Sequence, residues 1–79
     1  MAGRIIEVEL EKIHPNLRLI YSYEAIEALC RFIRGGGEID PLEIWFDGEG
    51  FRIKDGEKRW RACKWLRITH VKAKLIEFP

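Results

Sequence analysis

The sequence has no long apolar run, which excludes a membrane-spanning helix. About 20 consecutive apolar residues are needed to cross a bilayer, and charged side chains interrupt every apolar stretch of this chain well before that length. The first residues also differ from a secretory signal peptide, because Arg4, Glu7 and Glu9 break up any apolar segment there. We therefore expect a cytoplasmic protein without a membrane partner.

Cysteine and histidine are scarce as well. Cys30 and Cys63 both lie among apolar residues of expected helices, which is typical of buried, reduced thiols. His14 and His70 stand alone in the sequence, without the spacing that places several ligands around one metal ion. We therefore predict no metal site.

The chain also lacks internal repeats, low-complexity segments and an interdomain linker. Its 79 residues, of which 47% are hydrophobic, are enough for one small core that needs neither a metal ion nor a disulfide. We therefore predict a single domain over residues 1–79.

Net charge is small, only +1, but the charges are unevenly distributed. Residues 1–49 hold five Lys/Arg against ten Asp/Glu, a net of −5, whereas residues 50–79 hold nine against three, a net of +6. The basic half is a candidate surface for direct, sequence-independent DNA binding through phosphate contacts, although the two halves could instead pair with each other. The candidate residues for DNA are Lys58, Arg61, Lys64, Arg67, Lys72 and Lys74.

Apolar periodicity predicts the secondary structure. Ser22 is suited to cap a helix, and Gly35 is suited to end it at the first of three consecutive glycines. The predicted elements are a strand at 4–10, a turn at 13–16, a helix at 23–34, a hairpin of strands at 42–46 and 51–53, a helix at 57–67 and a strand at 70–75. This order predicts an α+β fold, in which two helices cover one small mixed β-sheet.

The stretch with the most chemical information runs from Asp55 to Ala62, where a strand ends in a tight turn and a helix begins. Lys58, Arg59 and Arg61 crowd into the first turn of that helix, where the backbone N–H groups and the helix dipole are already positive. A bound anion would balance this charge, as phosphates do at helix N-termini. On a helical wheel Arg59 points toward the sheet, so its planar guanidinium needs a phosphate or carboxylate partner.

The same residues allow two other interpretations. Asp55 and Glu57 could neutralise the cations within the protein, so that Arg59 would form a structural salt bridge. Alternatively, the two carboxylates could be catalytic, with Glu57 as a general base or with both holding a metal ion for phosphoryl transfer or hydrolysis. Trp60 and Trp65 lie on the flanks of this helix, and we interpret both as packing residues; Trp60 is the better candidate for stacking on a ligand.

The string GEKRWRA at Gly56–Ala62 resembles the GERRWRA box of the ParB N-terminal domain, which occurs in altered form in sulfiredoxins and free serine kinases. Upstream, the segment Ile33–Leu42 resembles the helix end, the glycine turn and the Pro-Leu pair of that family, and YSYEAIEAL at residues 20–28 resembles the preceding helix. The resemblance covers Ile6 to Ile76 and implies a ParB/sulfiredoxin-like fold.

The resemblance implies a nucleotide-binding module that works in chromosome or plasmid partitioning. Phosphates would be held by Gly56, Glu57, Lys58, Arg59 and Arg61. The implied ligand is CTP, with ATP or ADP as alternatives and Mg²⁺ as a companion ion, and DNA would be engaged directly or through a partner protein. The resemblance also implies that the base and sugar of the nucleotide are lined by Gly37, Ile39 and Pro41.

The chain departs from its relatives at several motif positions. Glu57 stands where sulfiredoxins have their cysteine, so that activity is excluded, and Asn16 lies near the place of the serine kinase glutamate, so we assign no kinase base. The family's Gln-Pro-Arg after this asparagine is replaced by residues 17–20, and Lys58 replaces the usual arginine. We expect binding rather than catalysis; the alternative is a ParB-like nuclease, nucleotide hydrolase or kinase that uses Glu57 and Asp55.

Overall fold

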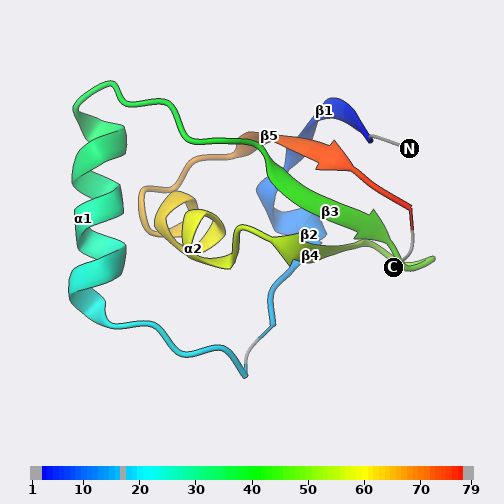
Figure 1. The fold of residues 1–79 in the computed structure, drawn as a ribbon, viewed down its shortest axis with the longest axis horizontal. Coiled ribbons are helices and arrows are strands. Elements are labelled where there is room, and N and C mark those ends of the chain that lie inside the picture. The colour runs from blue at the N-terminus through cyan, green and yellow to red at the C-terminus, as the bar shows by residue number, and fades with distance from the viewer. Residues whose placement is uncertain (1–2, 17, 78–79) are drawn as a thin grey trace.

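A computed structural model describes residues 3–16 and 18–77, which fold into a five-stranded mixed sheet and two α-helices (Figure 1). The predicted α+β class is therefore confirmed. No helix within these residues is long and apolar enough to cross a membrane. The elements are β1 (Arg4–Glu9), a 3-10 turn η1 (Leu10–Lys12), β2 (Ile13–His14), α1 (Tyr23–Arg34), β3 (Leu42–Phe46), β4 (Phe51–Asp55), α2 (Glu57–Trp65) and β5 (His70–Leu75).

The strands lie in the order β1-β5-β3-β4-β2. β1 pairs with β5 and β3 pairs with β4 in antiparallel fashion, whereas β3 with β5 and β2 with β4 are parallel. Val8 stands opposite Val71, and Leu42 stands opposite Ala73. Since side chains alternate along a strand, these apolar residues share one face of the sheet and the charged residues between them occupy the other.

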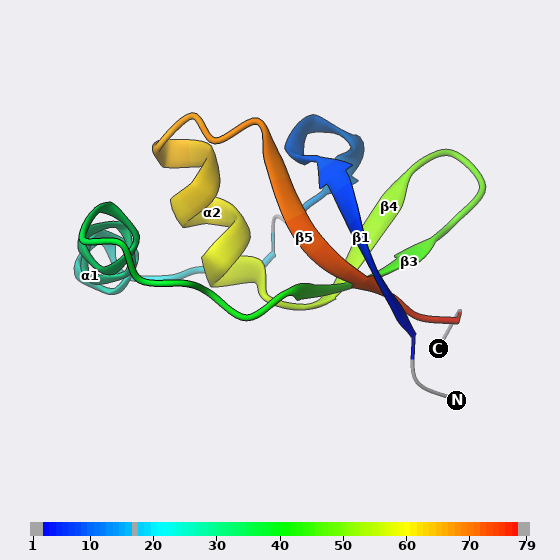
Figure 2. The same ribbon diagram turned by 90° about the horizontal axis from the view of Figure 1, so that it is seen from above.

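The core lies between this apolar face and α2. Leu42, Ile44 and Ala73 are completely buried there and cluster with Trp60 and Cys63 of α2. Figure 2 shows α2 between the sheet and α1. The predicted arrangement, in which both helices cover the sheet, therefore needs a correction for α1.

α1 packs mainly on the far side of α2, where its residues Ile26 and Cys30 form a second buried cluster with Ala62. Ile33 is the residue of α1, within the described chain, that also packs against the core cluster of the sheet. The bounds of α1 are as predicted, and the Oγ of Ser22 accepts a hydrogen bond from the Ala25 N–H at 3.2 Å. Cys30 and Cys63 are buried free thiols, as predicted, and burial raises the pKa of Cys63.

The predicted turn at 13–16 was wrong at its beginning, because Ile13 and His14 form β2. They pair with Phe51 and Arg52 of β4. This pairing is formed with a distant part of the chain, so no local pattern marks it. Smaller differences are that β4 continues to Asp55 and that Leu10 begins η1 instead of ending β1.

The helix predicted over 57–67 ends earlier, at Trp65. Arg67 takes the left-handed conformation with φ 59°, and its N–H donates to the Lys64 carbonyl at 3.1 Å. The Ile68 N–H donates to the Cys63 carbonyl at 3.0 Å. These two bonds form a Schellman C-cap. Glycine usually occupies the left-handed position of this motif, so an arginine there did not predict a helix end.

Candidate functional site

Gly56 forms the tight turn between β4 and α2. Its backbone is left-handed, with φ 113° and ψ 20°, and a Cβ atom there would lie 2.6 Å from Cδ2 of the buried Leu42. Gly56 is also the N-cap of α2 and offers no side chain to cap it. The first N–H groups of α2 have no acceptor within the helix, so this end of α2 retains donors for a ligand.

Arg59 points inward, as the helical wheel predicted. Its Nη1 donates to the carbonyl oxygens of Asp40, at 2.7 Å, and Pro41, at 3.0 Å. Its Nη2 donates to Oδ2 of Asp55 at 3.1 Å. The Arg59 side chain is only 19% exposed, whereas that of Asp55 is 71% exposed. Arg59 thus ties the chain before β3 to the start of α2 and has one partner that is open to solvent.

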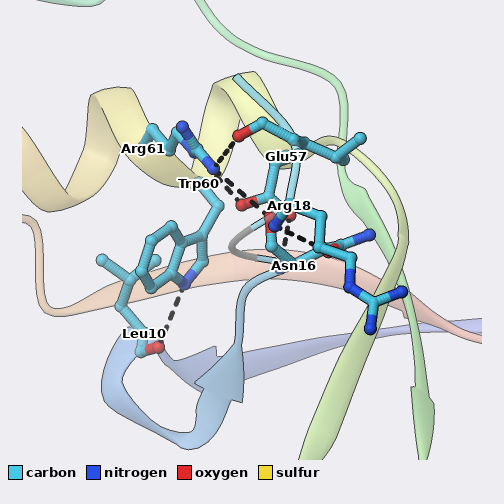
Figure 3. A network of polar contacts seen from close by, with 7 residues as sticks. Leu10, Asn16, Arg18, Glu57, Trp60 and Arg61 are labelled. Carbon is cyan, nitrogen blue, oxygen red and sulfur yellow. Dashed lines mark hydrogen bonds and ion pairs between the residues drawn. The ribbon is translucent and has the colours of Figure 1, made fainter. Parts of the chain in front are cut away.

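Glu57 and Arg61 form a second cluster on the same helix (Figure 3). Oε1 of Glu57 accepts from the Asn16 N–H at 3.0 Å, and Oε2 accepts from Nε of Arg61 at 3.2 Å. Nη2 of Arg61 donates to the Leu19 carbonyl at 2.6 Å and to the Asn16 carbonyl at 3.4 Å. Both carboxylate oxygens of the buried Glu57 are therefore used in fastening the loop after β2 to α2.

The two predicted catalytic acids are held by different arginines. Asp55 pairs with Arg59, and Glu57 pairs with Arg61. Within residues 3–16 and 18–77 there is no group of three His, Cys, Asp or Glu side chains that could hold a metal ion. The arrangement matches the interpretation in which these carboxylates neutralise the cations internally.

The remaining cation of the box is Lys58, which is exposed. In the part of the chain that the structure describes, Lys58 has neither an ion pair nor a side-chain hydrogen bond, in contrast to Arg59 and Arg61. It therefore carries an uncompensated positive charge in the first turn of α2, beside backbone N–H groups that have no acceptor within the helix.

Trp60 is a packing residue, as the sequence suggested. It is buried against the sheet, and its Nε1 donates to the Leu10 carbonyl at 3.3 Å (Figure 3). Trp65 is exposed on the opposite side, where its ring meets that of Tyr23 edge-on at a centroid distance of 5.0 Å. Both tryptophans thus pack within the protein, Trp60 against the core of the sheet and Trp65 against Tyr23 of α1.

The residues predicted to line the base and sugar are brought together only in part. Pro41 lies at the box, because its carbonyl accepts from Arg59. Gly37 and Ile39 line a separate cleft of about 270 Å³ with Cys63 and the beginning of β5. Sequence reasoning missed Phe32, whose exposed ring covers Gly37 so closely that a Cβ there would come within 2.5 Å of it.

A second hollow, of about 450 Å³, adjoins the loop that Glu57 holds. It brings together the side of β2, the loop that follows it and residues of β3 and β4. Its residues are His14, Pro15, Asn16, Arg18, Trp45, Arg52 and Ile53. These residues were not predicted to lie together, because β2 was not predicted and it is β2 that brings His14 beside Arg52.

The six cations predicted for DNA binding do not share one face. Lys64 lies on α2, where its Nζ sits 5.7 Å from the centre of the Trp60 ring. Lys72 and Lys74 alternate with buried residues of β5 and so lie on the outer face of the sheet, away from α2. Lys72 is also directly opposite Glu7 on β1. The structure thus splits this set between two sides of the molecule.

Comparison with known sequences places the site in context. The family described as the ParB N-terminal domain matches residues 1–79. A chromosome-partitioning protein ParB from Myxococcus xanthus is 31% identical over 72 residues, which are 87% of this chain and 24% of that protein. The chain therefore spans about a quarter of the length of such curated relatives.

Solved structures agree with this. The C-terminally truncated ParB of Caulobacter crescentus, complexed with CTP-gamma-S, superposes with a TM-score of 0.84 at 25% identity over 98% of this chain and 46% of that one. Sulfiredoxin from Arabidopsis thaliana superposes with a TM-score of 0.83 at 22% identity, over 95% of this chain and 86% of that one. The second likeness concerns the fold alone.

Proposed function

This chain belongs to the ParB N-terminal domain family, whose curated relatives include chromosome-partitioning proteins, and from that premise we propose that it is a nucleotide-binding module that holds a phosphate chain at the start of α2. The observation that carries the proposal is the left-handed turn at Gly56, which opens the N-terminal end of α2, where the first N–H groups have no acceptor within the helix and where the exposed Lys58 has no partner in the part of the chain that the structure describes. The Caulobacter relative bound to CTP-gamma-S supports a nucleotide as the ligand.

Arg59 is the second phosphate contact in this proposal. Its Nη1 is committed to two backbone carbonyls, whereas among residues 3–16 and 18–77 its Nη2 donates only to the exposed carboxylate of Asp55. A phosphate oxygen can replace that carboxylate without moving the rest of the side chain. Since guanidinium groups bind phosphate and carboxylate with the same planar geometry, the exchange keeps the hydrogen bond of Nη2.

Glu57 and Arg61 support the site by holding the neighbouring loop in place. Their side chains hold the loop after β2 against the first turn of α2, through both carboxylate oxygens of Glu57 and through Nε and Nη2 of Arg61. Of the box residues, Gly56, Lys58 and Arg59 therefore make the first contacts with phosphate in this proposal, and Nη1 of Arg61 is a further donor. CTP is the first ligand to test, with ATP and ADP as alternatives and Mg²⁺ as the counter-ion of the phosphates.

Pro41, with Gly37 and Ile39 beyond it, would line the sugar and base. Arg59 links this segment to the phosphate box through the Pro41 carbonyl, so that one side chain contacts both halves of the site. The setting that we propose is DNA partitioning or its regulation in the cytoplasm, with DNA engaged through a partner protein.

The burial and the hydrogen bonds of Glu57 favour binding over catalysis. A general base needs a carboxylate oxygen within hydrogen-bond reach of the proton that it removes. Both oxygens of Glu57 already accept protein N–H groups, and its side chain is 4% exposed. In the nuclease, hydrolase and kinase alternatives, Glu57 would first have to give up its hydrogen bonds with the Asn16 N–H and Arg61.

Isothermal titration calorimetry with CTP, ATP, ADP and inorganic phosphate, each with Mg²⁺, tests the proposal. We expect Lys58→Ala to weaken nucleotide binding by about tenfold to a hundredfold, since a charge-assisted hydrogen bond contributes about 1.5–3 kcal/mol. Lys54→Ala removes an exposed lysine of β4 outside the box and should bind as the parent does. Absence of heat with every ligand at millimolar concentration would refute the module, and conversion of the nucleotide to products would establish the enzyme alternative.

A further inference from the structure

We propose that Asp55 couples nucleotide binding to a divalent cation. In the free protein its carboxylate occupies the position on Arg59 that a phosphate takes in the complex. After displacement, the same carboxylate becomes the protein's ligand for the cation that accompanies the phosphates. This inference rests on the nucleotide-binding function proposed above and deepens it, because it assigns the contact between protein and cation to one side chain.

The ion pair between Asp55 and Arg59 joins a fixed side chain to a free one. Nη1 of Arg59 donates to the carbonyl oxygens of Asp40, at 2.7 Å, and Pro41, at 3.0 Å, so the guanidinium is held in place. The Asp55 side chain is 71% exposed, and among residues 3–16 and 18–77 it accepts a hydrogen bond from Nη2 of Arg59 alone. An exchange of partners on Nη2 therefore moves Asp55 and leaves Arg59 where it is.

The turn at Gly56 keeps the displaced carboxylate beside the phosphate. Asp55 is the last residue of β4, where its backbone pairs with Glu43 of β3, and Gly56 follows it as the N-cap of α2. Gly56 passes so close to Arg59 that a Cβ atom there would lie 3.1 Å from Nη2 and 3.3 Å from Cζ. A phosphate oxygen on Nη2 would thus lie next to the carboxylate that it replaces.

Two anions at this position repel each other. A nucleotide brings several negative charges, and Asp55 adds another once Arg59 has changed partners, since in the described part of the chain Arg59 is its only ion-pair partner. Such repulsion at short range weakens binding of the phosphates. A divalent cation between the carboxylate and a phosphate oxygen turns the repulsion into attraction.

The donors at this corner of the site fit Mg²⁺. This ion is usually bound through one or two carboxylates together with the phosphates of a substrate, and water completes its shell. Asp55 supplies one exposed carboxylate, whereas both oxygens of Glu57 already accept protein N–H groups. The described residues contain no group of three His, Cys, Asp or Glu side chains that could hold a metal ion by themselves. We therefore expect the cation and the nucleotide to bind together.

Calorimetric titration of the parent and of Asp55→Asn with CTP, ATP and ADP, in Mg²⁺ and in EDTA, tests the coupling. For the parent we expect Mg²⁺ to tighten nucleotide binding about tenfold. Asp55→Asn should bind the metal-free nucleotide about threefold to tenfold more tightly than the parent, because the competing ion pair and the repulsion are both removed. The same variant should gain less than about threefold from Mg²⁺, because it has lost the carboxylate that holds the cation.

Two further variants control for charge and for position. Asp55→Glu keeps a carboxylate at the same place, so it should keep both the weak metal-free binding and the gain from Mg²⁺. Glu49→Gln removes a carboxylate from the turn at the other end of β4 and should bind as the parent does in both buffers. Circular dichroism and the urea midpoint check that all variants fold, as expected for substitutions of exposed side chains.

The coupling would be overturned, with the nucleotide module intact, if the parent bound nucleotide equally well in Mg²⁺ and in EDTA. It would also be overturned if Asp55→Asn gained as much from Mg²⁺ as the parent, or if Asp55→Asn and Glu49→Gln shifted binding equally, which would reflect net charge alone. If neither the parent nor any variant bound a nucleotide in either buffer, the proposed function itself would fail, and the coupling with it.

Discussion

Glu57 and Arg61 lie one turn apart on α2 and form an ion pair of 3.2 Å, in which the glutamate side chain is 4% exposed and the arginine side chain is 25% exposed. Each also bonds the loop after β2, Glu57 through the Asn16 N–H and Arg61 through the Leu19 carbonyl. A glutamate in the first turn of a helix also suits the dipole. The pair therefore stabilises the approach of two segments that are distant in sequence, and its role is structural.

Replacing Glu57 by alanine should destabilise the fold by about 2–4 kcal/mol, because it leaves the Asn16 N–H without an acceptor and Arg61 without its counter-ion. The measurement is urea unfolding followed by circular dichroism. Glu27→Ala, which breaks the exposed pair of Glu27 with Arg31, is the matched control and should cost less than about 0.5 kcal/mol. If Glu57→Ala were as stable as the parent, the contacts of Glu57 with Asn16 and Arg61 would not stabilise the fold, and Glu57 would again be a candidate for catalysis.

Gly56 is required for two separate reasons, and a pair of variants can separate them. Gly56→Ala places a side chain at φ 113° and also 2.6 Å from Leu42, whereas Gly48→Ala has a similar φ of 100° with nothing within 4 Å. The left-handed backbone alone should cost about 1 kcal/mol, and the clash with a packed core side chain should add about 1–3 kcal/mol.

Thermal unfolding of the two glycine variants measures this difference. We expect Gly56→Ala to be the less stable of the two and to lose nucleotide binding as the box shifts away from β3. Equal destabilisation at both positions would mean that Leu42 moves freely aside, and the close approach of the turn to β3 would then have no energetic importance.

Local signals account for the parts of the fold that the sequence predicted. α1 is bounded by Ser22 and Gly35, whose effects act within a few residues, and the core faces of β3 and β5 follow from strict alternation. The inward direction of Arg59 follows from helical geometry for the same reason. These features do not depend on what the rest of the chain does.

The features that the sequence did not reveal depend on distant partners. β2 exists because Ile13 and His14 meet β4, and Glu57 is fixed by Asn16, 41 residues away. Arg59 donates to carbonyl oxygens of Asp40 and Pro41, 19 and 18 residues away, and a backbone carbonyl carries no mark in a sequence. A helical wheel indicates that the Arg59 side chain points inward and needs a partner, but it does not identify that partner.

Arg67 holds a left-handed backbone at the C-cap of α2, where a side chain is unfavourable. Arg67→Gly should therefore stabilise the fold by about 0.5–1 kcal/mol, measured by urea unfolding at neutral pH. Arg67→Ala removes the same charge but keeps a Cβ atom, so it should not stabilise. A gain in both variants would point to the positive charge rather than to the backbone as the source of strain.

The β3–β4 turn should make stability depend on pH through Asp47. The N–H groups of Glu49 and Gly50 and the side chain of Arg52 lower the pKa of Asp47 in the folded state. Because the folded state then binds fewer protons than the unfolded chain, this contribution is fully present above the unfolded pKa of about 4 and is lost as the pH falls through the lower folded pKa.

The urea midpoint, measured between pH 7 and pH 2, should therefore fall on acidification, and it should fall less in Asp47→Asn, which keeps an oxygen acceptor for the turn but cannot be protonated in this range. Glu49→Gln removes a carboxylate of the same turn that accepts none of these bonds, so it controls for the loss of an acid as such. If Asp47→Asn and the parent lose stability in parallel below pH 4, the hydrogen bonds of Asp47 do not favour its charged form and another carboxylate sets the acid limit of the fold.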